Sequence, residues 1–405
     1  MDHILVTTLG TYCDSLLMDN AISELAKTHK IVYLTDKNHK LPEDFIKVTF
    51  ETPSFFTNDP KIKIANTNRS FTWWAVTHPD KVYEAYNWST VIKRKMRKIL
   101  KTYDIKSIHI LYPAMGMLWL MPKIDIPTYI YYYAPGVLSK TLPWIFDSIL
   151  KDKHYKLYAH KNADYNKESG LTYLERISRY SVRQESIHEM LKSVNHVISW
   201  DKEVLPELDY VYKDLNILYA GALLTPDINK KDWPIDNSVN DFIKRKKQII
   251  FMSFGSYGDS TLLEKIVPKL IKKLTIYCKE NNAGLIYHNG NIENTEHILS
   301  INGFIQYEYI VPKSSLIIFT GSACLQNICL YNCVPMLFVP LLTEQFFWAR
   351  NYKHFTKKQY IDYQEERIPQ SLDFDSLMEK TDYLKKVSSS MHKNNSAQRV
   401  SGFLS

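Results

Sequence analysis

Two short turns in the sequence have the composition of loops that bind phosphate groups. One covers residues 319–323, reads FTGSA, and joins an apolar run to a segment of helical character. Gly321 permits a close approach of the backbone to a ligand, while Thr320 and Ser322 carry hydroxyls near the expected helix start. The first N–H groups of a helix attract anions, so this turn is a candidate phosphate site. A simple helix cap would use the same residue types.

The second turn, FGS at residues 254–256, places Gly255 and Ser256 directly after another apolar run. Both turns lie in a C-terminal half where short apolar runs alternate with longer amphipathic segments, which predicts parallel strands joined by helices. In such a sheet the carboxyl ends of the strands share one edge, where ligands bind. We expect strands at 248–253, 284–288, 316–320 and 336–340, with helices near 262–280 and after 322.

The N-terminal half begins with the same kind of unit. Residues 4–8 (ILVTT) form a short β-branched run, and Met18, Ala21, Ile22 and Leu25 then recur at helical spacing. This pattern predicts a strand followed by a helix, and a second strand follows at 30–35. Further strand-like runs lie at 107–112, 127–133 and 196–199. His109 alternates with isoleucines in one of them, which favours a structural role.

These patterns predict an α/β fold with two Rossmann-like domains. A polar stretch with two prolines, residues 219–238, reads as the connection between them. We predict an N-terminal domain over 1–225, a linker over 226–245, a C-terminal domain over 246–385 and a tail over 386–405. The final residues of the tail, HKNNSAQRVSGFLS, have the composition of a flexible segment.

Composition restricts the class of protein. The chain of 405 residues is 45% hydrophobic and 23% charged, values typical of globular proteins. The N-terminus lacks the pattern of a signal peptide, and the apolar runs are too short to span a bilayer, so we expect a cytoplasmic protein. An odd count of five cysteines without a secretory signal favours reduced thiols. No cysteine and histidine spacing indicates zinc, so we expect no metal.

The net charge of +8 has a local concentration in residues 93–101. Ile92, Met96, Ile99 and Leu100 fall on one face of the predicted helix, and basic residues cover the rest. A solvated helix face is the favoured interpretation, with peripheral membrane or polyanion contact as the alternative. The sequence contains no signature of a nucleic-acid-binding module, so we expect no nucleic-acid partner.

Residues 304–350 resemble the donor-site signature of the UDP-glycosyltransferase superfamily, without a gap. Phe304 lies at the position of the aromatic residue that stacks on the nucleobase, and Thr320 lies at the phosphate-loop position. Glu344 and Gln345 lie at the acidic-Gln pair that contacts the transferred sugar. Residues 251–256 (FMSFGS) are similar to the "vsfGS" motif that begins the family's C-terminal domain. Residues 8–14 (TLGTYCD) resemble the "TiGsrGD" opening of sterol and glycopeptide-antibiotic glycosyltransferases.

The resemblance implies a GT-B fold, with two Rossmann-like domains that face each other across a central cleft. It implies the inverting transfer of a sugar, a hexose, from a nucleotide sugar such as a UDP-sugar to a hydroxyl acceptor. The acceptor could be a lipid, a small molecule or a glycan, and no metal or other cofactor is expected. The turns at Gly255-Ser256 and Gly321-Ser322 would surround the diphosphate. Trp73 and Trp74 would contribute to the acceptor side.

Asp14 has two interpretations. The resemblance places it at the base that accepts the proton of the acceptor hydroxyl. An Asp at this position also suits the N-cap of the helix that contains Met18 and Leu25. The two roles are compatible in one residue.

Four departures from the family pattern affect the phosphate and ribose contacts. Thr320 replaces the phosphate-loop His, Cys324 and Leu325 replace small or hydroxyl residues, and Ile328 replaces a ribose-binding Glu. Each lost strong hydrogen bond typically weakens binding by about 1.5–3 kcal/mol. A catalytically inactive protein that binds nucleotide sugars or glycans is therefore an alternative. An epimerase with the same fold and a basic scaffold protein are weaker alternatives.

Overall fold

The chain forms two compact units, Met1–Leu223 with Asn395–Ser405 and Leu224–Asn394. The computed structural model describes residues 2–8, 18, 21–37, 41–51, 91–92, 94–111, 125–132, 192–204, 215–223, 237–255, 263–303, 305–341, 345, 348–349, 360–361, 368–370, 372–393 and 396–404. In this described part, no helix combines the length and the apolarity that crossing a bilayer would require.

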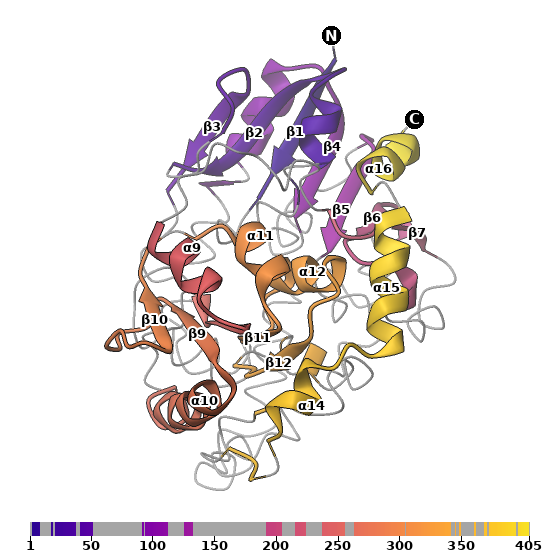
Figure 1. Cartoon of the computed structure of the whole chain (residues 1–405). Helices are drawn as coiled ribbons and strands as arrows, with labels where there is room; N and C mark the ends of the chain where they lie inside the picture. The colour runs from indigo at the N-terminus through magenta and orange to yellow at the C-terminus, as the bar shows by residue number, and fades with distance from the viewer. Residues whose placement is uncertain are drawn as a thin grey trace, which may run out of the picture. The chain divides into compact units, whose positions relative to one another are not determined.

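The first unit contains a seven-stranded sheet in the order β3-β2-β1-β4-β5-β6-β7 (Figure 1). Every neighbouring pair is parallel. The strands are β1 (His3–Thr7), β2 (Lys30–Asp36), β3 (Ile46–Phe50), β4 (Ile105–Leu111), β5 (Thr128–Tyr132), β6 (Asn195–Ile198) and β7 (Asn216–Tyr219). The central strands are buried along nearly their whole length, as expected for a parallel sheet with both faces covered.

The second unit contains a five-stranded parallel sheet in the order β10-β9-β8-β11-β12 (Figure 1). The strands are β8 (Gln248–Ser253), β9 (Ala283–His288), β10 (Ile298–Ile301), β11 (Leu316–Phe319) and β12 (Met336–Phe338). The helices are α9 (Asn237–Lys244), α10 (Val267–Asn281), α11 (Tyr307–Ile310), α12 (Ala323–Tyr331), α14 (Phe374–Met378) and α15 (Asp382–Lys393), and a 3-10 turn, η8 (Val311–Lys313), follows α11.

The helix α10 shows how the sequence pattern builds this unit. Leu270, Leu274 and Cys278 recur at a spacing of four residues and are buried in the core beneath the sheet. A proline in the first turn suits the helix start, because the first N–H groups of a helix have no intrahelical partner. Asn282, in the left-handed conformation with φ of 49°, ends the helix just before β9.

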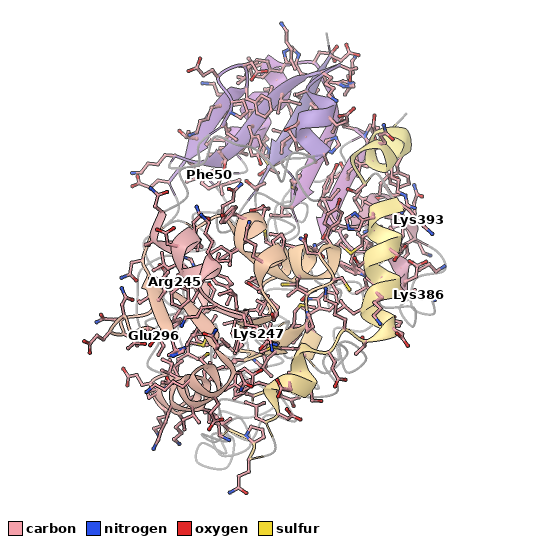
Figure 2. All side chains as sticks on the ribbon, viewed as in Figure 1. Phe50, Arg245, Lys247, Glu296, Lys386 and Lys393 are labelled. Carbon is pink, nitrogen blue, oxygen red and sulfur yellow. The ribbon has the colours of Figure 1, made fainter. Side chains whose placement is uncertain are left out.

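The C-terminal residues belong to both units. In the second unit α15 packs on α12, where Ser388 Oγ and His392 Nε2 donate hydrogen bonds to the carbonyl of Tyr331 over 2.8 and 3.0 Å. Lys386 and Lys393 of α15 are exposed (Figure 2). The last helix, α16 (Ser396–Leu404), belongs to the first unit.

Polar contacts and a buried side chain hold α16 on the first unit. Ser396 Oγ donates a hydrogen bond to the carbonyl of Ala222 over 2.7 Å, and Arg399 lies 3.7 Å from the carboxylate of buried Asp201. Val400 is fully buried. Residues 386–405, predicted as one tail, thus include the end of α15 in the second unit and all of α16 in the first. The predicted linker 226–245 likewise includes α9, whose Phe242 is buried.

Candidate functional site

The carboxyl ends of neighbouring strands in the second unit meet at one edge of the sheet. The register places His288 opposite Ser253, Ser253 opposite Phe319, and Phe319 opposite Phe338. In the sheet, β9 and β10 lie on one side of β8, and β11 and β12, which follow in the chain, lie on the other side. The strand order therefore reverses between β8 and β11, and open α/β sheets bind ligands outside the carboxyl ends of the strands at such a switch point.

A hydrogen-bonded group lies at the end of β8. Ser253 Oγ lies 2.9 Å from His288 Nδ1 and 3.2 Å from the hydroxyl of Tyr307. The backbone N–H of Gly255 also points at Ser253 Oγ, over 3.4 Å. On the other side of the imidazole, His288 Nε2 lies 2.7 Å from the carbonyl oxygen of Gly303. These contacts connect the ends of β8, β9 and β10 with α11.

The proton positions in this group follow from its chemistry. The Gly303 carbonyl can only accept, so His288 Nε2 carries the proton and Nδ1 of the neutral ring accepts one from Ser253. Burial lowers the pKa of His288, and this effect outweighs the bond to Gly303, which acts to raise the pKa. Because its pKa is lowered, the ring is neutral near pH 7. The lone pairs of Ser253 Oγ then accept from Tyr307 and Gly255. Every polar contact in the group has a donor and an acceptor.

The turn after β11 makes a close backbone approach. Gly321 has φ of 103°, a conformation that other residues rarely adopt. A Cβ atom there would lie 3.1 Å from the ring of Phe338 and 3.3 Å from Cβ of Gln345. Ser322 is the N-cap residue of α12, yet its side chain makes no capping hydrogen bond. The first N–H groups of a helix have no intrahelical partner, so this turn can offer backbone donors to an anion.

Gln345 is therefore next to the Gly321 turn, although 24 residues separate them in the sequence. Its side chain is buried, and Gln345 Oε1 accepts a hydrogen bond from the N–H of Leu341 over 2.9 Å. This bond joins Gln345 to Leu341, close to the Gly321 turn at the start of α12. The two parts of the predicted donor signature thus lie together at the edge of one sheet.

The structure describes four residues at which the sequence departs from the donor-site signature that it resembles. Thr320 is only 4% exposed, so it does not project a hydroxyl as a long imidazole would. Ile328 is completely buried in α12, where a ribose-binding carboxylate would need to face the ligand. Cys324, in the first turn of α12, is partly exposed. Ser322 is also partly exposed, so it and Cys324 are the polar side chains that this turn presents.

Tyr307 and Tyr309 are engaged in contacts within the unit. The Tyr307 hydroxyl bonds Ser253, and its ring lies edge-on to Phe251 and His288 at 5.9 Å. The Tyr309 hydroxyl bonds Asn240 of α9, and Lys313 Nζ lies 3.3 Å from the centre of the Tyr309 ring. Both rings are therefore held in place by contacts within the second unit.

Sequence reasoning did not identify Ser253 or Gly303 as members of this group. For Ser253 the sequence did offer a signal, because it lies in the FMSFGS segment and ends a predicted strand beside the strand that ends at His288. Six predicted site residues lie outside the described part of the chain: Asp14, Trp73, Trp74, Ser256, Phe304 and Glu344.

Among the residues that the structure describes, no three His, Cys, Asp or Glu side chains gather where they could hold a metal ion. The described cysteines, Cys278, Cys324, Cys329 and Cys333, are thiols. Burial raises the pKa of Cys278 to about 12, so this thiol is not ionised near neutral pH.

No family model and no curated protein matches the sequence. Solved structures do match, at low identity. UGT71G1 of Medicago truncatula, complexed with UDP-glucose, is 14% identical over 100% of this chain and 97% of that chain, with a TM-score of 0.64. A UDP-glucosyltransferase from Polygonum tinctorium is 9% identical over 100% and 98% of the two chains, with a TM-score of 0.62. The calicheamicin glycosyltransferase CalG4 is 12% identical over 100% and 93%, with a TM-score of 0.56.

These likenesses cover the whole chain and agree with the two parallel sheets, each with its strand order reversed at a central switch point. The predicted fold class is confirmed: the chain has the GT-B fold of two Rossmann-like units that these glycosyltransferases share.

Proposed function

We propose that the protein is a glycosyltransferase that moves a sugar from a UDP-sugar to a hydroxyl acceptor with inversion. The observation that carries the proposal is the Gly321 turn, which opens α12 at the switch point of the second sheet and packs against Gln345. The GT-B fold supplies the context, because several solved proteins that share it were crystallised with UDP or UDP-glucose.

In this proposal the diphosphate lies at the start of α12. The negative charge that leaves with the nucleotide needs stabilisation in the transition state, and preoriented N–H groups provide it without reorganisation. The Gly255 and Gly321 turns flank this position on β8 and β11. The hydrogen bonds of Ser253 hold the first of these turns, and the contact with Gln345 holds the second.

The proposed transfer uses Asp14 as the base and no metal. A carboxylate beside the acceptor hydroxyl removes its proton as the oxygen attacks the anomeric carbon, and the sugar configuration inverts. A hexose is the sugar that the resemblance favours, and Glu344 and Gln345 would bond its hydroxyls. The acceptor is a molecule with a hydroxyl group.

One observation favours a second candidate function, the binding of a nucleotide sugar without transfer. Thr320 is buried and uncharged at the position where the resemblance expects an imidazole. Without that group the leaving diphosphate receives less stabilisation, and each lost charge-assisted bond typically costs about 1.5–3 kcal/mol. The turn could then still hold a ligand but fail to catalyse.

The first experiment measures binding and turnover separately. Calorimetry with UDP, TDP and GDP identifies the nucleotide, and hydrolysis of the matching sugar nucleotide measures turnover. Binding of UDP with release of sugar supports the transferase. Binding without turnover over a broad panel of acceptors supports the second candidate. If no nucleotide binds at millimolar concentration, both proposals fail.

The second experiment changes Asp14→Ala. We expect turnover to be lost while affinity for UDP stays the same, because the base takes no part in holding the donor. If Asp14 acts only as a helix cap, turnover persists and stability falls by about 1 kcal/mol. Asp44→Ala, at an exposed position in the same unit, is the matched control and should change neither quantity.

A further inference from the structure

One helix of the first unit accounts for most of the net charge of the protein. Residues 93–101 contain six basic and no acidic residues. The whole chain has 51 basic and 43 acidic residues, so 45 basic and 43 acidic residues remain outside this segment. Without the helix the net charge falls from +8 to +2. The positive charge is therefore a local feature and not a general property of the surface.

The structure shows how this charge is presented. Residues 91–92 and 94–102 are helical, and Ile92, Met96 and Ile99 are buried on one face. Arg94, Arg97, Lys98 and Lys101 are exposed. They are spaced at i, i+3, i+4 and i+7, so they share one face that extends for about 10 Å along the helix. We call these four residues the cationic face.

No carboxylate in the described part of the chain neutralises the cationic face. None of its four residues forms an ion pair with a described residue. Other exposed lysines of the same unit do form such pairs: Lys27 with Glu24, Lys37 with Glu51, and Lys106 with Asp104. Like charges at i and i+4 repel, so the face lowers the stability of its own helix unless an anion covers it.

Exposed Val91 lies on the same side of the helix. It is 44% exposed, and it precedes Arg94 by three residues and Lys98 by seven. An aliphatic side chain beside a row of cations fits the headgroup region of a bilayer, where the chain can reach the acyl boundary and the cations meet lipid phosphates. A nucleic-acid backbone would use the cations but would gain little from the valine.

We propose that the cationic face binds the surface of a bilayer that contains anionic lipids. This binding does not depend on the proposed transfer reaction. The partner is a membrane surface because the observations combine clustered charge, absence of described counter-charges and an aligned aliphatic residue. Such contact places the first unit at the membrane, and hydroxyl-bearing lipids would then be accessible to it.

Vesicle flotation with the full-length protein tests this directly. The protein should bind vesicles of phosphatidylcholine with phosphatidylglycerol and should not bind vesicles of phosphatidylcholine alone. Each Lys or Arg near an anionic surface contributes about fivefold to partitioning, so the combined change Arg94→Gln, Arg97→Gln, Lys98→Gln and Lys101→Gln should lower binding roughly 600-fold. Raising salt to about 1 M should weaken binding by the wild-type protein, because the screening length falls to about 3 Å.

The matched control removes the same charge from another exposed helix region: Lys265→Gln, Lys269→Gln, Lys272→Gln and Lys279→Gln, on α10 and the turn before it. This variant should bind vesicles within about threefold of wild type, because Glu264 and Glu280 already lie among these lysines. Equal loss in both variants would overturn the proposal in favour of general charge. Failure of wild type to bind anionic vesicles, or binding to duplex DNA but not to vesicles, would also overturn it. Unchanged thermal unfolding shows that each variant is folded.

Discussion

Both units contain buried histidines bonded to hydroxyl side chains, but at different places along their strands. In the first unit His109 lies within β4, where Nδ1 and Nε2 contact Tyr131 and Ser107 over 2.9 and 3.0 Å. In the second unit His288 is the last residue of β9 and bonds Ser253 and Gly303. The side-chain chemistry is similar, so position alone separates a core contact from a group that holds a loop at the switch point.

The comparison shows that the position of a histidine along its strand decides its role. A residue within a central strand of a parallel sheet is covered on both faces and can only stabilise the fold. A residue at the carboxyl end bonds the turn that follows, and that turn is where an open α/β sheet binds its ligand.

The largest effect on UDP affinity should come from Gly321→Ala. The change forces a side chain into a φ of 103°, and its Cβ would press on Phe338 and Gln345. The left-handed conformation costs roughly 1–2 kcal/mol, and the displaced turn should weaken UDP binding by about 100-fold or more. Calorimetry and urea unfolding measure the two effects.

Gly221→Ala is the matched change in the first unit. Gly221 has φ of 83°, and a Cβ atom at this position would lie 3.2 Å from Asp201 Oδ1. Stability should fall by a similar amount, while the affinity for UDP stays at the wild-type value. Equal loss of UDP binding in both variants would show that the Gly321 turn has no special relation to the ligand.

An intermediate effect on UDP affinity is expected from only one of the two histidines. His109→Ala removes two hydrogen bonds and leaves a cavity in a fully buried site, so it should lower stability by about 2–4 kcal/mol without changing UDP affinity. His288→Ala should lower stability by less, about 1–2 kcal/mol, and weaken UDP binding roughly tenfold through the loosened Ser253 and Gly255 turn. A larger change in UDP affinity in His109→Ala than in His288→Ala would contradict these different roles of the two histidines.

The last expected effect is a dependence of stability on pH. Burial lowers the pKa of His109 to about 3, whereas an unfolded chain has a histidine pKa of about 6.5. Between these values the unfolded state binds a proton that the folded state does not, so stability falls as pH falls from about 6.5 towards 3. The loss is about 1.4 kcal/mol per pH unit for this group. Burial also lowers the pKa of His288, which adds in the same direction.

Unfolding by urea at several pH values, in wild type and in His109→Leu, isolates this contribution. The variant should be less stable at neutral pH but should show a weaker decline between about pH 6.5 and pH 4.5. Parallel declines in the two proteins would mean that His109 does not titrate as its burial requires.

The strands that sequence patterns failed to predict share one property. β3, β7 and β10 lie at the edges of their sheets, and each is only partly buried. An edge strand has fewer apolar positions, so its pattern is weak. The other edge strand, β12, is fully buried and forms a further parallel bridge from Phe338 to Tyr360, and its apolar run was predicted.

Local pattern was sufficient for the positions of the central strands and helices along the chain, for the two glycine turns and for the structural role of His109. These features depend on the periodicity of a few neighbouring residues and on backbone conformation, which short segments of sequence determine. The apolar face of the helix at 91–102 is confirmed for the same reason, because Ile92, Met96 and Ile99 are buried.

Only the tertiary structure decided which distant residues meet. Ser253 is 35 residues from His288 and 54 residues from Tyr307, and Gln345 packs against a turn formed 24 residues earlier. The return of α16 to the first unit has no local signal either. Such contacts depend on strand order and register, which arise from the packing of the whole sheet and not from the periodicity of any one segment.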